Sequence, residues 1–171
     1  MRRVAGGLIH EAYWTIATGR WILRPQSVPE PNVDLLKALL PDPGTDVAQL
    51  FRDDDWFATT AEALAGLFDP AVESVPAWRG AGTTYSGIDG FREMWLDWLE
   101  PWASYHVQVD EMIEVGDSVV VLVRDRARHH GMDAEVELIS GSVWTFGNGK
   151  IVRVQFYANR EELREAVGFE S

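Results

Sequence analysis

Asp125 is the residue of this sequence with the clearest potential for acid–base chemistry. It lies in the run Ser118–Arg128, where strand periodicity places it on the same face as Val121 and Val123. A carboxylate on an apolar wall is poorly solvated, which raises its pKa and lets it act as a general base or acid near neutral pH. The alternative is that Asp125 lies near the end of the strand and reaches water or a backbone amide.

The candidate site residues around Asp125 divide into hydrogen-bond donors and a lining for an apolar ligand. The expected donors are Ser140, Ser142 and Tyr85. The expected lining consists of Val123, Trp95, Trp98, Trp144 and Phe156. Trp95 and Trp98 belong to an aromatic stripe at helical spacing, which is typical of a core and also of a helix that covers a pocket.

Other catalytic chemistries find little support in the sequence. His129 and His130 are adjacent in a predicted loop, a poor spacing for a metal site, so no metal is expected. There is no cysteine, and there is no P-loop, Rossmann glycine pattern or nucleophile elbow. We therefore expect no cofactor and no Ser-His-Asp triad.

A β-hairpin over residues 135–158 is the strongest structural prediction. Two runs rich in β-branched and aromatic residues flank Gly147-Asn148-Gly149, which can supply the positive φ angles of a tight turn. Opposite charges fix the register with the preceding strand if Arg126 lies opposite Glu137 and Arg128 opposite Glu135. Across the turn we expect Phe146 to pair with Lys150, and Ser140 with Phe156.

That register separates two faces of the sheet. One face carries mostly apolar residues and should be covered by helices: Val121, Val123, Leu138, Trp144, Val154 and Phe156. Asp125 is the ionisable residue on this face. The opposite face carries Arg124, Arg126, Arg128, Glu135 and Glu137. It is interpreted either as a solvated ladder of ion pairs or as the contact surface of a dimer.

The rest of the chain predicts helices before the sheet. Helices are expected over residues 35–40, 56–68 and 91–99, with Asp46 and the cluster Asp53-Asp54-Asp55 acting at helix N-termini. A strand over residues 105–115 precedes Ser118–Arg128, and a short helix over residues 161–167 ends the chain. Helices followed by a four-stranded antiparallel meander define an α+β fold.

Two segments are predicted. Residues 1–32 form a basic, proline-terminated extension, with a helix over residues 9–23, that is either poorly ordered or an arm for a partner or membrane. Residues 33–171 form a single domain.

The net charge of −12 argues against binding to nucleic acid or to anionic membranes. The absence of cysteine fits a cytoplasmic protein.

Several motifs in order resemble the SnoaL-like branch of the nuclear transport factor 2-like (NTF2-like) superfamily. They are Tyr85-Ser86-Gly87 with Gly90-Phe91, the run 115–120, Val143-Trp144-Thr145-Phe146 followed by Gly149-Lys150-Ile151-Val152, and the ending 157–161. The resemblance covers residues 46–168. It implies a curved antiparallel sheet wrapped into a cone, with helices on its concave face enclosing a pocket, and a homodimer.

The resemblance also allows a comparison of sites. Cyclases and epoxide hydrolases of the superfamily place a catalytic Asp in the last strand, at the position of Phe156. The hydrolases also use an Arg and an Asp two residues apart in the strand before the hairpin, at the positions of Val123 and Asp125. This sequence therefore keeps one acid of that set and lacks the Arg and the last-strand Asp.

Two functional hypotheses follow. In the first, an apolar pocket binds a small hydrophobic molecule, and any isomerase, cyclase or hydrolase chemistry is acid–base catalysis by Asp125. In the second, the domain is a non-catalytic dimerisation or interaction module whose cone is filled by its own side chains. A cavity beside Asp125 would favour the first hypothesis.

Overall fold

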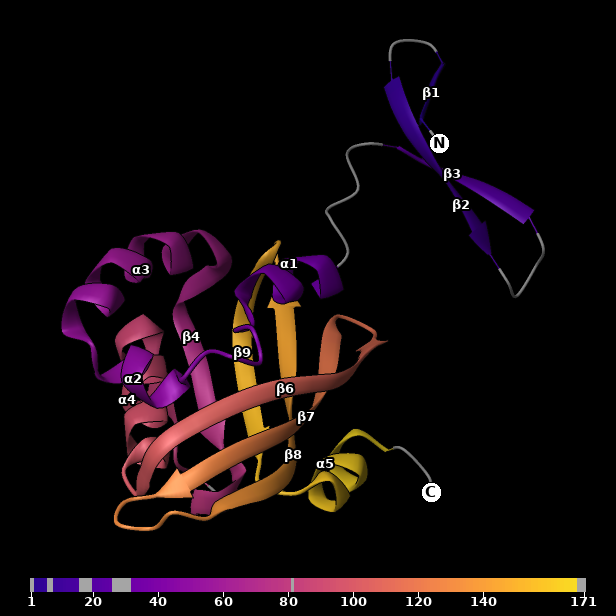
Figure 1. Ribbon diagram of the computed structural model, residues 1–171. Helices are drawn as coiled ribbons and strands as arrows, with labels where there is room; N and C mark the ends of the chain where they lie inside the picture. Colours follow the sequence, from indigo (N-terminus) through magenta and orange to yellow (C-terminus); the bar gives the residue numbers. More distant parts are fainter. Residues whose placement is uncertain (1, 6–7, 16–19, 26–31, 81, 169–171) are drawn as a thin grey trace. The chain divides into compact units, whose positions relative to one another are not determined.

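The computed structural model describes residues 2–5, 8–15, 20–25, 32–80 and 82–168. The chain divides into two units, Met1–Pro31 and Asn32–Ser171. The second unit contains the helices, the large sheet and every candidate site residue (Figure 1). No helix in the described part of the chain is long and apolar enough to cross a membrane.

The first unit contains a three-stranded antiparallel sheet. Its strands are β1 (Arg2–Ala5), β2 (Leu8–Thr15) and β3 (Arg20–Pro25). The helix expected over residues 9–23 is therefore wrong. The segment is rich in Ile, Tyr, Trp and Thr, whose branched or aromatic side chains favour strands, and this preference outweighs the helical spacing of its apolar residues.

The described part of the second unit contains five helices, and the four predicted over residues 35–40, 56–68, 91–99 and 161–167 are confirmed to within four residues at each end. The five helices are α1 (Asn32–Leu39), α2 (Val47–Arg52), α3 (Asp54–Leu67), α4 (Gly87–Leu99) and α5 (Arg160–Val167). The capping predictions are confirmed. Asp46 accepts a hydrogen bond from the Ala48 amide, and Asp53 accepts one from the Trp56 amide.

A six-stranded sheet forms the other half of this unit. Its strands are β4 (Phe68–Pro76), β5 (Tyr85–Ser86), β6 (Trp102–Val115), β7 (Ser118–His129), β8 (Glu135–Gly147) and β9 (Lys150–Tyr157), and a 3-10 turn at Ala77–Arg79 follows β4. Their order in the sheet is β5-β4-β9-β8-β7-β6. The predicted meander β6–β9 is antiparallel, but β4 joins β9 in parallel. The sheet is therefore mixed, and it is not closed into a barrel.

The register predicted from opposite charges is confirmed between β7 and β8. Arg126 lies opposite Glu137 and Arg128 opposite Glu135, and Asp125 lies opposite Leu138. This pairing fixes which residues of both strands share a face, because side chains alternate along a strand.

The register predicted between β8 and β9 is wrong. Gly147, rather than Phe146, pairs with Lys150, and Ser142, rather than Ser140, pairs with Phe156. The turn contains two residues, Asn148 and Gly149, which both have positive φ angles (53° and 77°), as a type I′ turn requires. A register shift between Phe146 and Thr145, two pairs from the turn, restores the predicted apolar face.

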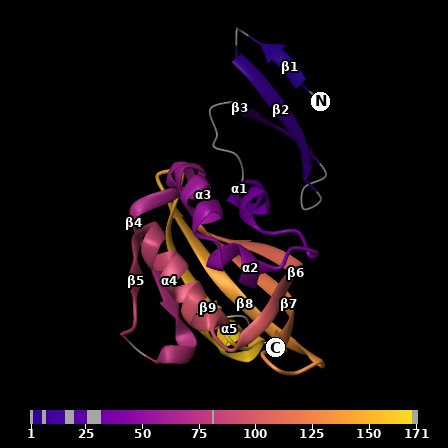
Figure 2. The same ribbon diagram turned by 60° about the vertical axis from the view of Figure 1, so that its left-hand side comes forward.

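Helices cover both faces of the sheet. On the concave face, α1 to α4 pack against a large apolar core that includes Phe68, Val121, Trp144 and Val154 (Figures 1 and 2). On the opposite face, Leu163 of α5 packs in a smaller core with Val120, Leu122 and Val143. The prediction of helices on the concave face is thus confirmed for α1 to α4, and α5 covers part of the other face.

Gly141 of β8 allows α5 to approach the sheet closely. A Cβ atom at this position would lie 2.6 Å from Cδ1 of Leu163 and 2.8 Å from the carbonyl oxygen of Val121. Both distances are shorter than a van der Waals contact, and the second involves backbone. A larger residue at position 141 would therefore displace the helix.

Candidate functional site

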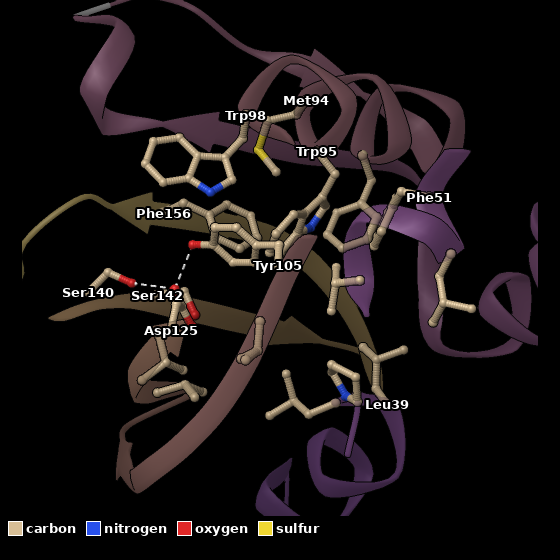
Figure 3. A pocket seen from close by; sticks show the side chains of 18 of the residues that line it. Leu39, Phe51, Met94, Trp95, Trp98, Tyr105, Asp125, Ser140, Ser142 and Phe156 are labelled. Carbon is tan, nitrogen blue, oxygen red and sulfur yellow. Dashed lines mark hydrogen bonds between the residues drawn. The ribbon is translucent and has the colours of Figure 1, made fainter. Parts of the chain in front are cut away.

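A cavity of about 350 Å³ lies between the helices and the concave face of the sheet (Figure 3). α2 and α4 contribute Phe51, Trp95 and Trp98 to its lining, and the sheet contributes Val121 and Trp144. The lining is mostly apolar and aromatic, as is usual for sites that bind small molecules.

Asp125 is the buried carboxylate of the cavity. It lies on β7, is 3% exposed and lines the cavity wall. Its Oδ2 atom accepts hydrogen bonds from the hydroxyls of Tyr105, at 2.7 Å, and Ser140, at 3.1 Å (Figure 3). Its Oδ1 atom is buried and has no hydrogen-bond partner among the described residues. One oxygen is therefore held by the protein, and the other lacks a partner among the described residues.

Burial raises the pKa of Asp125 from 3.8 to about 6, although the hydrogen bonds from Tyr105 and Ser140 oppose the shift. The direction follows from desolvation, which disfavours the charged form of a carboxyl group. A group that titrates near pH 6 is largely ionised at neutral pH and can still take up a proton.

Tyr105 is the polar residue that the sequence analysis missed. It lies on β6 opposite Ala127, and its neighbour Val107 lies opposite Asp125. Burial and the charge of Asp125 raise the pKa of its phenol well above the ordinary value. The phenol therefore remains a hydrogen-bond donor to the carboxylate.

A β-bulge at Asp110 places Tyr105 on this face. Glu111 pairs with Leu122 and Val109 with Val123, so Asp110 is the extra residue on β6. Without it, strand alternation would turn His106 toward the cavity and Tyr105 away from it. In the sequence, the alternation of Tyr105, Val107 and Val109 with polar residues could have indicated that Tyr105 lies on the apolar face of the sheet.

The backbone of Tyr105 is also fixed by a helix N-terminus. Its amide donates to Oδ1 of Asp46 at 3.1 Å, the same oxygen that caps α2 through the Ala48 amide at 3.0 Å. Asp46 therefore ties α2 to the residue that holds Asp125.

Arg160 forms hydrogen bonds to the backbone of two strands that line the cavity. The guanidinium of Arg160 donates to the carbonyl oxygens of Val123, at 2.9 Å, and Ser140, at 3.4 Å. It also donates to Oδ2 of Asp110 at 2.6 Å, and this contact holds the pKa of Asp110 below its usual value. Arg160 thus links the bulge of β6 to the strands that carry Asp125 and Ser140.

Eight of the nine residues predicted for the site line the cavity. They are Trp95, Trp98, Val123, Asp125, Ser140, Ser142, Trp144 and Phe156. Ser140 contacts Asp125, as described above, whereas Ser142 accepts a hydrogen bond from Nε1 of Trp144 at 2.8 Å.

Tyr85 lies outside the cavity, so the prediction that it donates into the pocket is wrong. Its hydroxyl donates to Asp97, which also forms an ion pair with Arg79 at 3.2 Å. Strand β5 is a two-residue edge strand before α4, too short to carry its side chains toward the centre of the sheet.

Within the part of the chain that the structure describes, no group of three or more His, Cys, Asp or Glu residues is arranged to hold a metal ion.

Comparison with known proteins identifies the class of protein that this fold and cavity define. The SnoaL-like domain family matches residues 36–154, more than half of the sequence. The chain therefore belongs to the SnoaL-like domain family, which confirms the resemblance seen in the sequence motifs. No functionally curated protein matches the sequence.

The chain is also similar to several solved structures. A candidate SnoaL-like polyketide cyclase from Jannaschia sp. CCS1 aligns with a TM-score of 0.59 and 15% identity, over 85% of this chain and 97% of its own. TerC, crystallised with polyporic acid, aligns with a TM-score of 0.49 and 22% identity, over 71% of this chain and 95% of its own. An NTF2-like protein from Burkholderia pseudomallei K96243 aligns with a TM-score of 0.49 and 21% identity, over 67% of this chain and 89% of its own. At these identities the likeness concerns the fold alone.

Proposed function

We propose that the protein binds a small hydrophobic molecule in the cavity and that Asp125 exchanges a proton with it. The observation that carries the proposal is a buried carboxylate with one unpartnered oxygen on the wall of an aromatic-lined cavity. The volume of about 350 Å³ falls within the range of roughly 300–1,000 Å³ that is common for ligand sites.

The two oxygens of Asp125 have different roles in this proposal. Oδ2 is held by Tyr105 and Ser140, which orient the carboxylate and stabilise its ionised form. Oδ1 is the atom that takes a proton from the ligand, or returns it, because no protein donor among the described residues occupies it. A pKa of about 6 suits both directions of transfer near neutral pH.

The alternative of a purely structural module predicts a cone filled by its own side chains. Trp98, Trp144 and Phe156 have some of the largest side chains available to fill it, and all three instead border the cavity. The cavity therefore favours the ligand-binding hypothesis.

Binding can be tested by calorimetry with β-naphthylmethanol, a neutral probe with an aromatic body. Wild-type protein should bind it, and Val123→Phe, which fills the cavity wall, should weaken binding at least about tenfold. Met132→Phe is the control, because Met132 is 56% exposed and does not line the cavity. Failure of the wild type to bind, or equal binding by Val123→Phe, would contradict the proposal.

A change in the protonation of Asp125 on binding can be tested in the same experiment. The binding enthalpy near pH 6 should depend on the ionisation enthalpy of the buffer, because binding changes the protonation of Asp125. Asp125→Asn should fold and lose this dependence. An Asp125→Asn variant that unfolds would assign the residue a structural role instead.

We also propose that the protein forms a homodimer through the outer face of β7 and β8. Ile139 is exposed there beside the oppositely charged Arg126 and Glu137, which offers an apolar contact within a complementary charge pattern. Light scattering should give twice the chain mass of 19.2 kDa for the wild type. Ile139→Glu should give the single mass, and a monomeric wild type would refute the dimer.

A further inference from the structure

The geometry points to a hydrophobic amine as the ligand, bound as an ammonium ion with its N–H at Oδ1 of Asp125 and its apolar body among the aromatic rings. This inference rests on the proposed function, since it names the chemical class of molecule that the same cavity would take. It follows from the charges, the rings and the unpartnered oxygen of the site.

The charge of the lining favours a cation. Among the described residues that line the cavity, the ionisable side chains are Asp42, Tyr105, Asp125 and Tyr157, and no Lys, Arg or His is present. Asp42 lies at the exposed edge of the lining, whereas Asp125 is buried. An anionic ligand would therefore meet like charge in a poorly solvated site, and a cationic ligand would meet opposite charge.

Arg160 leaves the charge of Asp125 largely uncompensated inside the cavity. Arg160 lowers the pKa of Asp125 only as a minor effect, after burial and the two hydroxyl donors. Its guanidinium is committed to Asp110 and to the carbonyl oxygens of Val123 and Ser140. The charge of Asp110 also opposes its influence.

The unpartnered oxygen of Asp125 favours a ligand that donates a hydrogen bond. Oδ1 of Asp125 is buried without a hydrogen bond from the described residues, and an ionised carboxylate in that state is costly. An ammonium N–H would supply both the missing hydrogen bond and the opposite charge. A neutral hydroxyl would supply the hydrogen bond alone, so it should bind more weakly.

Aromatic rings surround the same end of the cavity. The ring of Tyr105, whose hydroxyl bonds to Asp125, lies edge-on to the rings of Trp95 and Trp98 at centroid distances of 6.3 and 6.4 Å. Phe156 lies 5.5 Å from Trp95. The faces of such rings attract cations and also pack well against an apolar body (Figure 3). Carboxylate and rings together therefore fit an amine with a hydrophobic substituent.

Three probes that share one aromatic body test the inference: β-naphthylmethylamine, β-naphthylmethanol and β-naphthoate. Calorimetry at about pH 8, where Asp125 is ionised and the amine is protonated, should show the amine binding at least about tenfold more tightly than the alcohol. The naphthoate should bind most weakly. If the alcohol binds as tightly as the amine, the amine assignment is overturned while the proposed function stands. If none of the three binds, both fail.

The pH dependence supplies a test that needs no variant. Because the amine should bind to the ionised carboxylate, and about one-tenth of Asp125 with a pKa of about 6 is ionised at pH 5, the affinity should fall about tenfold from pH 8 to pH 5. The affinity of the alcohol should change less. An amine affinity that stays constant over this range overturns the inference.

Asp125→Asn should remove the preference for the amine, because the amide keeps the shape and loses the charge. Asp97→Asn is the matched control, since Asp97 is paired with Arg79 and Tyr85 outside the cavity. Equal selectivity in wild type and Asp125→Asn would overturn the assignment. Loss of selectivity in both variants would also overturn it, because the effect would then be one of overall charge.

Discussion

The two faces of β7 both begin with apolar residues and continue with charged ones, but the charged residues are buried on one face and exposed on the other. On the concave face, Asp125 is enclosed with two hydroxyl donors. On the outer face, Arg124 and Arg126 are exposed, and α5 covers only the apolar half of the strand around Val120 and Leu122. The covering elements, rather than the strand itself, decide whether a charged residue is solvated.

This difference explains why an acid–base group belongs to one face alone. Arg124 contacts Glu137 at 3.6 Å and Asp110 at 3.5 Å, with about half of its side chain in solvent. Such exposed pairs are screened and contribute little. Asp125 lies one residue further along the strand, yet burial moves its pKa into the range used in acid–base catalysis. Four predictions test this contrast, in order of decreasing effect.

Leu163→Ala should cause the largest loss of stability. Leu163 is fully buried between α5 and the outer face, and removing a buried leucine side chain typically costs about 2–5 kcal/mol. Urea denaturation would measure the change in the free energy of unfolding. Val115→Ala, at an exposed position of the same face, is the control and should cost much less. Equal losses would mean that α5 does not protect this face.

Ionisation of Asp125 should destabilise the fold by about 3 kcal/mol. Its pKa is about 6 in the folded protein against 3.8 as the reference value, so the folded state holds the proton more tightly. The stabilisation by protonation is therefore present below about pH 4 and is lost as the pH rises to about 7. The measurement is the difference in unfolding free energy between wild type and Asp125→Asn across this range. A difference independent of pH would refute the burial of the charge.

Tyr105→Phe should raise the pKa of Asp125 further and cost about 1.5–3 kcal/mol, because a buried carboxylate loses a hydrogen bond. The pKa can be followed by the NMR carboxyl shift during a pH titration. Tyr85→Phe is the control, since Tyr85 bonds to Asp97 outside the cavity. A pKa of Asp125 that is unchanged in Tyr105→Phe would remove Tyr105 from the site.

The smallest effect should come from the charges of the outer face. A double-mutant cycle on Arg124 and Glu137 should give a coupling of about 0.2–1 kcal/mol, as for other exposed ion pairs. The cycle on Arg126 and Glu137 tests the direct cross-strand neighbours. The structure predicts coupling in the first cycle at least as large as in the second, because Arg124 is the arginine that contacts Glu137. The reverse order would contradict this geometry.

Local patterns in the sequence predicted most of the elements and one register. Asp46 and Asp53 predicted helix starts because their side chains satisfy amides of the first turn. The pairing of Arg126 with Glu137 placed Asp125 on the apolar face because alternation transmits one pairing along the whole strand. These predictions depended on residues that are close in sequence or joined by a short loop.

The predictions that failed depended on local irregularities or on weak signals. A two-residue turn and a nearby shift changed the pairing of Ser142 and Phe156. The short edge strand β5 left Tyr85 outside the cavity. In the first unit, strands replaced the expected helix because the spacing of its apolar residues was a weaker signal than their β-branched and aromatic character.

Sequence alone was sufficient for the α+β class, the SnoaL-like resemblance and the choice of Asp125 as the candidate acid. Only the tertiary structure decided that Tyr105 holds this acid, that Oδ1 is left unpartnered and that a cavity lies beside it. One extra residue at Asp110 reverses the face of residues 104–109 on β6, and burial depends on helices far away in sequence. Alternation is a local property, whereas the bulge and the enclosure arise when distant segments pack together.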